Sequence, residues 1–220
     1  MKQWKTQVIN DNPTYPFLLV DNWYNKDEEK AVWKELDFLS SIPKDEIDRA
    51  ETTIVAKDRV TKKPLSNAYR FYIDNLYNRR DMSPIFRAMK KQQTPEFHKL
   101  LESGCMPYAR SFTSTNKDST LVSYYEDSDH YKPHFDVFEW TCLIWLVREP
   151  IRFSGGDFSF PEPDIDIKLK NNRMIIFPSC YLHSVSPLKF KNKPDEFGYG
   201  KYTITHFYYT TPDGRVNENK

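Results

Sequence analysis

Short apolar and aromatic runs separated by polar turns dominate the second half of the chain. Residues 121–125, 141–147 and 174–177 are such runs, with lengths that suit buried strands. Residues 201–209 have two distinct faces when read with the period of a strand. Residues 108–113 and 119–125 are predicted to form a hairpin. Residues 151–160 are predicted to form a turn and a further strand, and strands are also predicted at 165–169 and 183–187.

Many short strands with turn signals between them are typical of a double-sheet jelly roll. We therefore expect a mostly β fold with flanking helices, an α+β chain whose core is a double-stranded β-helix. At 220 residues the chain is long enough for one sizeable core. A single domain is expected, in which residues 1–105 support a jelly-roll catalytic core at 106–210.

Helical signals lie in the first half of the chain. Asn25 is a good N-cap for a helix whose apolar residues fall on one face. An N-cap residue followed by proline occurs twice and predicts helices over 84–92 and 95–103. Strands are predicted at 17–20 and 52–56.

The stretch that ends in His134-Phe135-Asp136 carries the candidate chemistry. Alternate residues of a strand point to the same face, so His134 and Asp136 are predicted to aim at one point. His183, which opens a strand after a Pro-Ser break, is expected to supply a third ligand. Two imidazoles and one carboxylate form the facial triad that suits non-haem Fe(II) with open coordination positions.

The sequence around these ligands resembles a known family. The prolyl 4-hydroxylase-like Fe(II)/2-oxoglutarate oxygenases share the run Y-x-x-G-x-x-Y-x-P-H-x-D. This sequence resembles that run, with Ser in place of Gly, at Tyr125, Ser128, Tyr131, Pro133, His134 and Asp136. Further likeness lies in Thr141, Gly155-Gly156-Asp157-Phe158 and Lys201-Tyr202-Thr203. The resemblance covers roughly residues 107–210 in the family's order.

This resemblance implies a dioxygenase that uses Fe(II), 2-oxoglutarate and O2, with ascorbate as reductant. In such enzymes 2-oxoglutarate is converted to succinate while a substrate C–H bond is hydroxylated. The catalytic metal ligands would be His134, Asp136 and His183, and the carboxylate distinguishes the chain from related halogenases. In this family the segment before the core often forms a mobile lid, so residues 57–82 are either a lid or a solvated loop followed by a packed strand.

The last predicted strand offers a site for the co-substrate. Lys201, Thr203 and Thr205 share one face of it. A buried ammonium needs a partner, and the distal carboxylate of 2-oxoglutarate would be that partner. By resemblance, Tyr125 would donate to the same carboxylate.

Two choices at this site stay open. Tyr124 rivals Tyr125, because a shift of one residue swaps the faces of a strand. Lys193 rivals Lys201, because it lies at the family's usual distance from the second His, although in a polar loop. His206 lies on the opposite face from Lys201 and is interpreted as structural.

The resemblance leaves the prime substrate open between a prolyl or other residue of a peptide or protein and a small molecule. Two observations argue against nucleic acid as the substrate. The net charge is only +1, and the chain has Lys201 and Phe207 in the region where nucleic-acid demethylases carry two Arg. Two other classes compete with the oxygenase: a cupin-like metal-binding jelly-roll protein without 2-oxoglutarate chemistry, and a catalytically inactive binding module.

The number of cysteines and the hydropathy of the sequence indicate the compartment in which the protein is expected. The three cysteines fit neither a disulfide framework nor a zinc site, which favours free thiols in a reducing compartment. The sequence has no apolar run of transmembrane length and no signal-peptide core at its start. A cytoplasmic protein without a membrane partner is expected.

Overall fold

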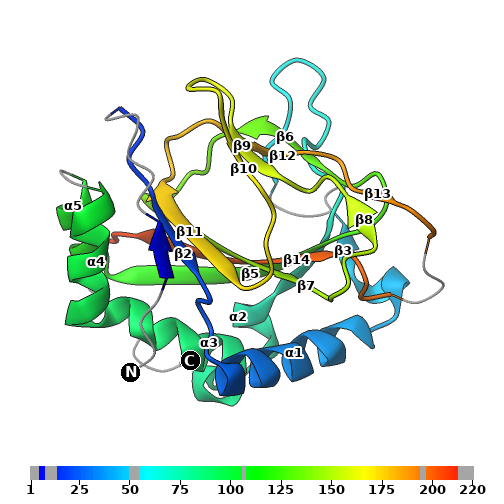
Figure 1. Cartoon of the computed structure of the whole chain (residues 1–220), viewed down its shortest axis with the longest axis horizontal. Coiled ribbons are helices and arrows are strands. Elements are labelled where there is room, and N and C mark those ends of the chain that lie inside the picture. Colours follow the sequence, from blue (N-terminus) through cyan, green and yellow to red (C-terminus); the bar gives the residue numbers. More distant parts are fainter. Residues whose placement is uncertain (1–4, 8–13, 50–54, 106–107, 194–196, 213–220) are drawn as a thin grey trace.

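The computed structural model of the chain describes residues 5–7, 14–49, 55–105, 108–193 and 197–212 (Figure 1). The strands are β1 (Lys5–Gln7), β2 (Leu18–Asp21), β3 (Asp48–Arg49), β4 (Tyr69–Tyr72), β5 (Lys117–Tyr125), β6 (Tyr131–His134), β7 (Trp140–Val147), β8 (Phe153–Ser154), β9 (Phe158–Phe160), β10 (Ile165–Ile167), β11 (Arg173–Pro178), β12 (His183–Val185), β13 (Lys189–Phe190) and β14 (Lys201–Tyr209). The helices are α1 (Lys26–Ser40), α2 (Ile73–Leu76), α3 (Pro84–Met89), α4 (Pro95–Cys105) and α5 (Ala109–Thr113), with the 3-10 turns η1 (Lys44–Glu46), η2 (Arg80–Met82) and η3 (Lys90–Gln93).

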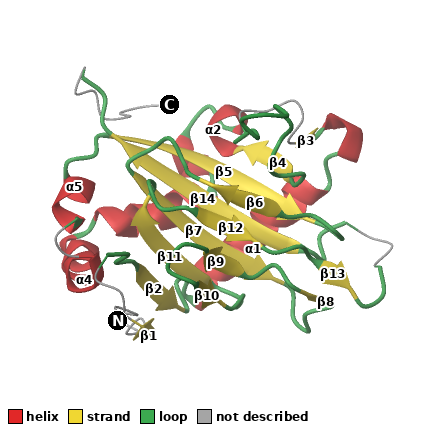
Figure 2. Ribbon diagram, turned by 90° about the horizontal axis from the view of Figure 1, so that it is seen from above, coloured by secondary structure: helices red, strands yellow, loops and turns green. Residues whose placement is uncertain are grey.

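Two antiparallel sheets form the layers of the predicted jelly roll. The larger has the order β1-β2-β11-β7-β14-β5-β4-β3, and the smaller has the order β10-β9-β12-β6. Figure 2 shows the smaller sheet lying over the inner strands of the larger one. Between the layers lies a buried, largely aromatic cluster that includes Phe17, Trp145, Phe158, Phe160 and Phe177. The mostly β fold with flanking helices is confirmed.

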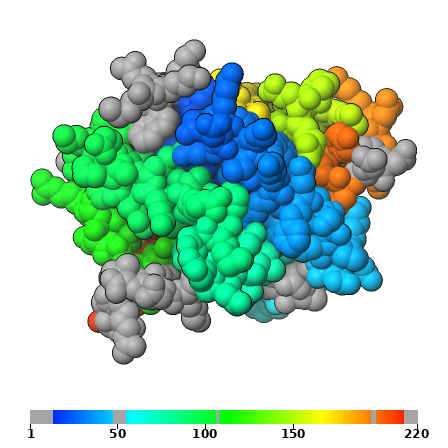
Figure 3. Space-filling view, turned by 90° about the horizontal axis from the view of Figure 1, so that it is seen from below, coloured from blue at the N-terminus to red at the C-terminus, as the bar shows by residue number. Residues whose placement is uncertain are grey.

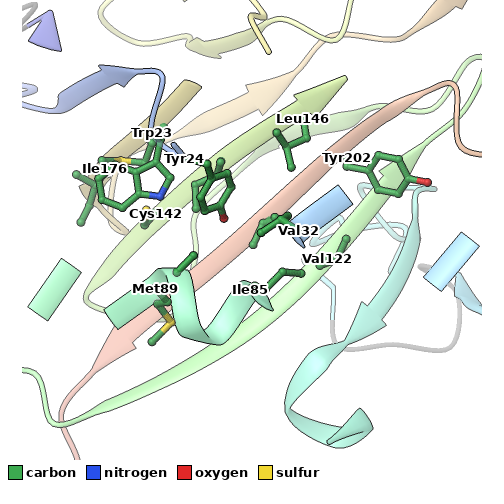
Figure 4. Packing of buried hydrophobic residues seen from close by; sticks show 14 of the residues in the cluster. Trp23, Tyr24, Val32, Ile85, Met89, Val122, Cys142, Leu146, Ile176 and Tyr202 are labelled. Atoms are coloured by element: carbon green, nitrogen blue, oxygen red, sulfur yellow. The ribbon is translucent and has the colours of Figure 1, made fainter. Parts of the chain in front are cut away.

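Helices cover the other face of the large sheet (Figures 1 and 3). Side chains of α1 and α3 pack there against residues of β5, β7 and β14. Figure 4 shows Val32 and Ile85 from the helices beside Val122 and Leu146 from the sheet. Because one face of the sheet is closed in this way, a site for a ligand must lie on the face toward the smaller sheet.

The predicted capping of α1 is confirmed. The Asn25 side chain accepts hydrogen bonds from the backbone of Asp27 and Glu28, and Glu28 reaches back to the Asn25 backbone, which completes a capping box. Farther along α1, the buried carboxylate of Glu35 accepts from Ser83 Oγ at 2.7 Å and from Ile85 N at 2.9 Å. The carboxylate thus joins α1 to the start of α3.

The expected hairpin between 108–113 and 119–125 is wrong. Residues Ala109–Thr113 form helix α5, and β5 pairs with β4 and β14 instead. Phe112 packs against Phe97, Trp140 and Tyr208, and the Trp140 indole donates to Ser111 Oγ. These tertiary contacts override the strand preference of a stretch rich in aromatic and hydroxyl side chains.

The first half of the chain contributes strands as well as helices to the core. β2 pairs with β11, and β4 pairs with β5, so residues from before position 106 extend both sides of the large sheet. The predicted helices over 84–92 and 95–103 are present as α3, η3 and α4, the last running through Cys105. A division into a support region and a catalytic core within one domain stays a prediction.

The expected lid region contains a packed strand, as one of the two interpretations had it. Tyr69–Tyr72 is β4, and the residues before it form a turn closed by a bridge between Lys57 and Pro64. A bridge between Ser66 and Tyr131 ties this turn to the smaller sheet. Of the predicted strand 52–56, residues 52–54 lie outside the described residues and the last two are not strand.

Candidate metal and co-substrate site

A cavity of about 420 Å³ opens between the two sheets. Strands β4, β5, β7 and β14 of the large sheet form its floor, and β6 and β12 of the smaller sheet form its roof. The lining includes all three predicted metal ligands, His134, Asp136 and His183. It also includes Tyr125, Thr203 and Thr205 among the residues predicted to bind 2-oxoglutarate.

The three predicted ligands converge at one place in this cavity. His134 and His183 are paired directly across β6 and β12. Their Nε2 atoms lie 3.7 Å and 3.4 Å from the two carboxylate oxygens of Asp136, and the three ligand atoms all lie within 4.8 Å of one another. Cis ligands of an octahedral ion are about 3 Å apart, so a small contraction of the cluster would fit such an ion.

Asp136 reaches the cluster by a different route from the predicted one. Strand β6 ends at His134, and Asp136 lies in the bend beyond it, so the shared strand face is not what aligns the two side chains. The backbone N–H of Asp136 donates to Ser179 O at 3.1 Å, and Thr141 Oγ donates to its carboxylate at 2.7 Å. Thr141 is itself 2.7 Å from Ser179 Oγ. This small network holds the carboxylate toward the imidazoles.

The histidines are oriented for metal binding by backbone carbonyls. His134 Nδ1 lies 2.8 Å from Lys132 O, and His183 Nδ1 lies 2.9 Å from Tyr181 O. A carbonyl can only accept, so each Nδ1 carries a hydrogen, and in the neutral tautomer this leaves Nε2 as the atom that can bind a metal. Burial, with His183 close by, lowers the pKa of His134 to about 2, which keeps its imidazole neutral.

Aromatic rings fix the imidazoles further. Tyr131 stacks on His134 with ring centroids 3.4 Å apart, and Phe158 stacks on His183 at 5.6 Å. Phe177 contacts the His183 ring edge-on. Three aromatic residues, including the second Tyr of the sequence motif, therefore hold the two imidazole rings and limit their rotation.

Lys201 is fully buried at the end of β14 nearest Gly156. Its Nζ donates to Gly156 O at 2.7 Å and lies 5.3 Å from the centroid of the Tyr125 ring. Burial lowers the pKa of this ammonium to about 7. Thr203 Oγ, on the same strand face, is buried without a hydrogen-bond partner among the described residues. A ligand carboxylate would complete the bonding of both groups.

The structure bears on the two choices that the sequence left open. Tyr125 lies beside Lys201 in the strand register and lines the cavity. Tyr124 points to the helical side, where its hydroxyl accepts from the N–H groups of Gly198 and Gly200. Lys193 is exposed, whereas Lys201 is fully buried.

His206 lies on the face away from the cavity, as predicted. Its ring is buried and its Nδ1 is 2.9 Å from Thr120 Oγ. One cavity residue escaped the sequence analysis: Arg70 of β4 lines the cavity and is 4% exposed. The alternation of Tyr69-Arg70-Phe71-Tyr72 is a signal that could have placed it on the inner face of a strand.

Comparisons with known proteins agree with this geometry. Residues 120–209 match the family model of the 2OG-Fe(II) oxygenase superfamily. The matched segment contains His134, Asp136 and His183, and the match supports a dioxygenase of the kind that uses Fe(II), 2-oxoglutarate and O2. A comparison with curated proteins found no match.

Solved structures share the fold of this 2OG-Fe(II) oxygenase at low sequence identity. A prolyl-4-hydroxylase from Pseudomonas putida has 13% identity and a TM-score of 0.59, covering 93% of this chain and 97% of that chain. A prolyl hydroxylase from Trichoplax adhaerens, in complex with a hypoxia inducible factor peptide fragment, has 14% identity and a TM-score of 0.57, covering 97% and 91%. The epimerase SnoN from nogalamycin biosynthesis has 14% identity and a TM-score of 0.51, covering 89% and 78%.

The range of these neighbours shows that the fold alone does not select the substrate, because a peptide hydroxylase and an epimerase share it. The helices described in this oxygenase are too short or too polar to cross a membrane.

Proposed function

We propose that this 2OG-Fe(II) oxygenase hydroxylates a C–H bond of a substrate that enters the cavity between the two sheets. The observation that carries the proposal is the convergence of His134, Asp136 and His183 in the cavity, together with a buried ammonium on the same strand face as Thr203 and Thr205. In this assignment the three side chains hold Fe(II), and Lys201 binds 2-oxoglutarate. A prolyl or other residue of a peptide is one candidate substrate, since a structural neighbour is seen with a peptide.

In this assignment the residues of the chain would have the following roles. The neutral imidazoles and the Asp136 carboxylate bind the metal, and the carbonyls behind each Nδ1 keep both rings oriented. Lys201, Thr203, Thr205 and Tyr125 hold the distal carboxylate of 2-oxoglutarate. When bound, iron and 2-oxoglutarate together activate O2, so that succinate and CO2 are formed and a C–H bond is hydroxylated. The protein's part is positioning and exclusion of water.

A cupin-like metal protein would keep the three ligands but would not need a buried Lys on the cavity side. Lys201 therefore favours the oxygenase over that alternative, and so does the superfamily match. Ascorbate is proposed as the reductant that keeps the iron in the Fe(II) state. Among the described residues, the exposed Cys180 is the cysteine on the surface, and it takes no part in this assignment.

Anaerobic titration of the purified protein with Fe(II), with and without 2-oxoglutarate, tests the proposal. A weak visible charge-transfer band is expected only when both are present, because the chelated co-substrate gives rise to it. His183→Ala should lose the band and bind iron much more weakly, whereas His98→Ala, which changes a histidine on α4, should behave as wild type. Iron binding without a band, and without succinate formation in air, would support the cupin-like alternative.

A further inference from the structure

Arg70 is a second cationic side chain at the cavity, and the assignment above gives it no role. It lies on β4, opposite Ser123 of β5, which is in turn opposite Thr203 of β14. The side chain lines the cavity, and its guanidinium carbon lies 5.4 Å from the centroid of the Tyr131 ring. Tyr131 also stacks on His134, so Arg70 and a predicted metal ligand both adjoin the same ring.

The guanidinium is buried without an acid to pair with. Its Nε and Nη2 atoms are buried and have no hydrogen-bond partner among the described residues. Two partly buried arginines of the chain are paired with acids: Arg173 binds Asp21 with two hydrogen bonds, and Arg80 binds Asp118. An uncompensated buried charge destabilises a fold, so a group left in this state is expected to have a partner that arrives with a ligand.

The carboxylates nearest the cavity are already engaged elsewhere. Asp136 faces the two imidazoles and accepts from Thr141. Asp74, which also lines the cavity, accepts from the Thr120 backbone at 2.6 Å and pairs with Arg80. The anion that would satisfy Arg70 must therefore come from outside the described part of the chain.

We propose that Arg70 binds a carboxylate of the prime substrate, which makes the substrate an acid with an apolar body. This inference rests on the proposed function, because it assigns 2-oxoglutarate to Lys201. Lys201 lies beside Tyr125, two residues along β5 from the position opposite Arg70, so the two cations lie at different positions along the sheet. The planar fork of Arg suits bidentate binding of a carboxylate.

The apolar part of the expected substrate follows from the rest of the lining. Val137 is 89% exposed and Phe135 is 48% exposed, and both line the cavity beside the metal ligands. Phe138 and Phe207 stack on each other in the same lining at a centroid distance of 4.3 Å. Exposed apolar side chains gathered at a cavity are typical of a surface that binds a ligand.

Benzoate and its neutral counterpart benzamide are suitable probes, because they differ in the charge and share the apolar ring. Binding is measured by calorimetry to anaerobic protein loaded with Mn(II) and saturated with 2-oxoglutarate. Wild type should bind benzoate about ten-fold or more tightly than benzamide, as one charge-assisted contact implies. Arg70→Gln should abolish this preference, Arg70→Lys should retain part of it, and the affinity for 2-oxoglutarate should stay within about two-fold.

Three outcomes would overturn the proposal. Wild type without a preference for benzoate, or Arg70→Gln with the preference intact, would show that Arg70 binds no substrate carboxylate. A loss of about ten-fold or more in 2-oxoglutarate affinity in Arg70→Gln would assign Arg70 to the co-substrate instead. A wild-type protein that binds no 2-oxoglutarate would refute the proposed function, yet the benzoate preference could still be measured on the metal-loaded protein.

Thermal unfolding of the ligand-free protein separates a binding role from a structural one. Arg70→Met removes a buried charge that has no acidic partner among the described residues, so its unfolding midpoint should equal or exceed that of wild type. The matched control is Arg173→Met, which breaks a partly buried ion pair and should lower the midpoint. A lower midpoint for Arg70→Met would indicate that Arg70 stabilises the fold, and would contradict the proposal.

Discussion

The ammonium of Lys201 combines full burial with a single backbone acceptor among the described residues. Burial lowers its pKa from 10.5 to about 7. Between these two values the unfolded chain binds the proton that the folded chain releases, so the destabilisation that Lys201 causes is greatest below pH 7 and diminishes as the pH rises. A ligand carboxylate favours the charged form and should raise the pKa again.

We therefore expect 2-oxoglutarate to bind with uptake of a proton above pH 7. Its dissociation constant, measured by anaerobic titration of the metal-loaded protein, should increase by up to about ten-fold per pH unit. Lys201→Arg should bind 2-oxoglutarate with little pH dependence, because Arg stays charged.

Lys201→Ala should weaken 2-oxoglutarate binding about ten- to hundred-fold while metal binding persists. Lys193→Ala is the matched control and should bind 2-oxoglutarate as wild type does. Weak binding by Lys193→Ala together with normal binding by Lys201→Ala would refute the assignment.

Ser128 stands where the family motif usually has Gly, and its backbone explains that preference. Its φ is 70°, in the left-handed region, and its N–H donates to Leu188 O at 2.8 Å. Relief of this conformation should outweigh the entropic cost of glycine, so Ser128→Gly should raise the free energy of unfolding by up to about 1 kcal/mol. Urea denaturation measures it. Ser154→Gly, at an exposed strand position with ordinary φ, should lower stability, and equal losses at both sites would contradict the argument.

At the scale of elements, Glu35 holds the helical layer together. Its buried carboxylate accepts from a side chain and a backbone N–H at the start of α3. Glu35→Ala would leave both buried donors unpaired, at about 1–3 kcal/mol each, so the free energy of unfolding should fall by about 2–5 kcal/mol. The exposed Glu102→Ala on α4 should change it by less than about 0.5 kcal/mol. A Glu35→Ala protein as stable as wild type would show that the helices do not depend on this link.

The elements that the sequence predicted well are those specified by local chemistry. The capping box at Asn25, the Ser-Pro and Thr-Pro helix starts and the fully apolar run of β7 each contain their own signal. Residues 109–113 were predicted wrongly because the contacts of Phe112, with partners far along the chain, decide their conformation.

The candidate site was likewise predicted from the sequence only in part. The H-x-D spacing together with the family resemblance selected residues that meet in the cavity, although Asp136 reaches it from beyond the end of β6. The faces of Tyr124 and Tyr125 could not be told apart, because the register of β5 against β14 fixes them. Arg70 was missed because its position depends on β4 joining the sheet through non-local pairing.

For the whole molecule, ligand binding should be visible as stabilisation. The three predicted metal ligands come from β6, the bend after it and β12, so a bound ion links segments that are distant in sequence. Mn(II) and 2-oxoglutarate, each present at about a hundred times its dissociation constant, should each raise the free energy of unfolding by about 2.7 kcal/mol. Differential scanning fluorimetry detects this as a rise in the unfolding midpoint. Chelation should reverse the rise. His183→Ala should show little of it, and an unchanged rise in that variant would refute the ligand assignment.

The outer strands of the eight-stranded sheet have a consequence for the protein in concentrated solution. β1 and β3 are three and two residues long, and their sequences, Lys-Thr-Gln and Asp-Arg, carry charge. Edge strands of this kind discourage another chain from adding its own backbone to the sheet. The long strands β5, β7 and β14, rich in aromatic and β-branched residues, have a neighbour on each side. These three strands therefore become available to another chain when the protein unfolds, so aggregation through them should follow the unfolding rate.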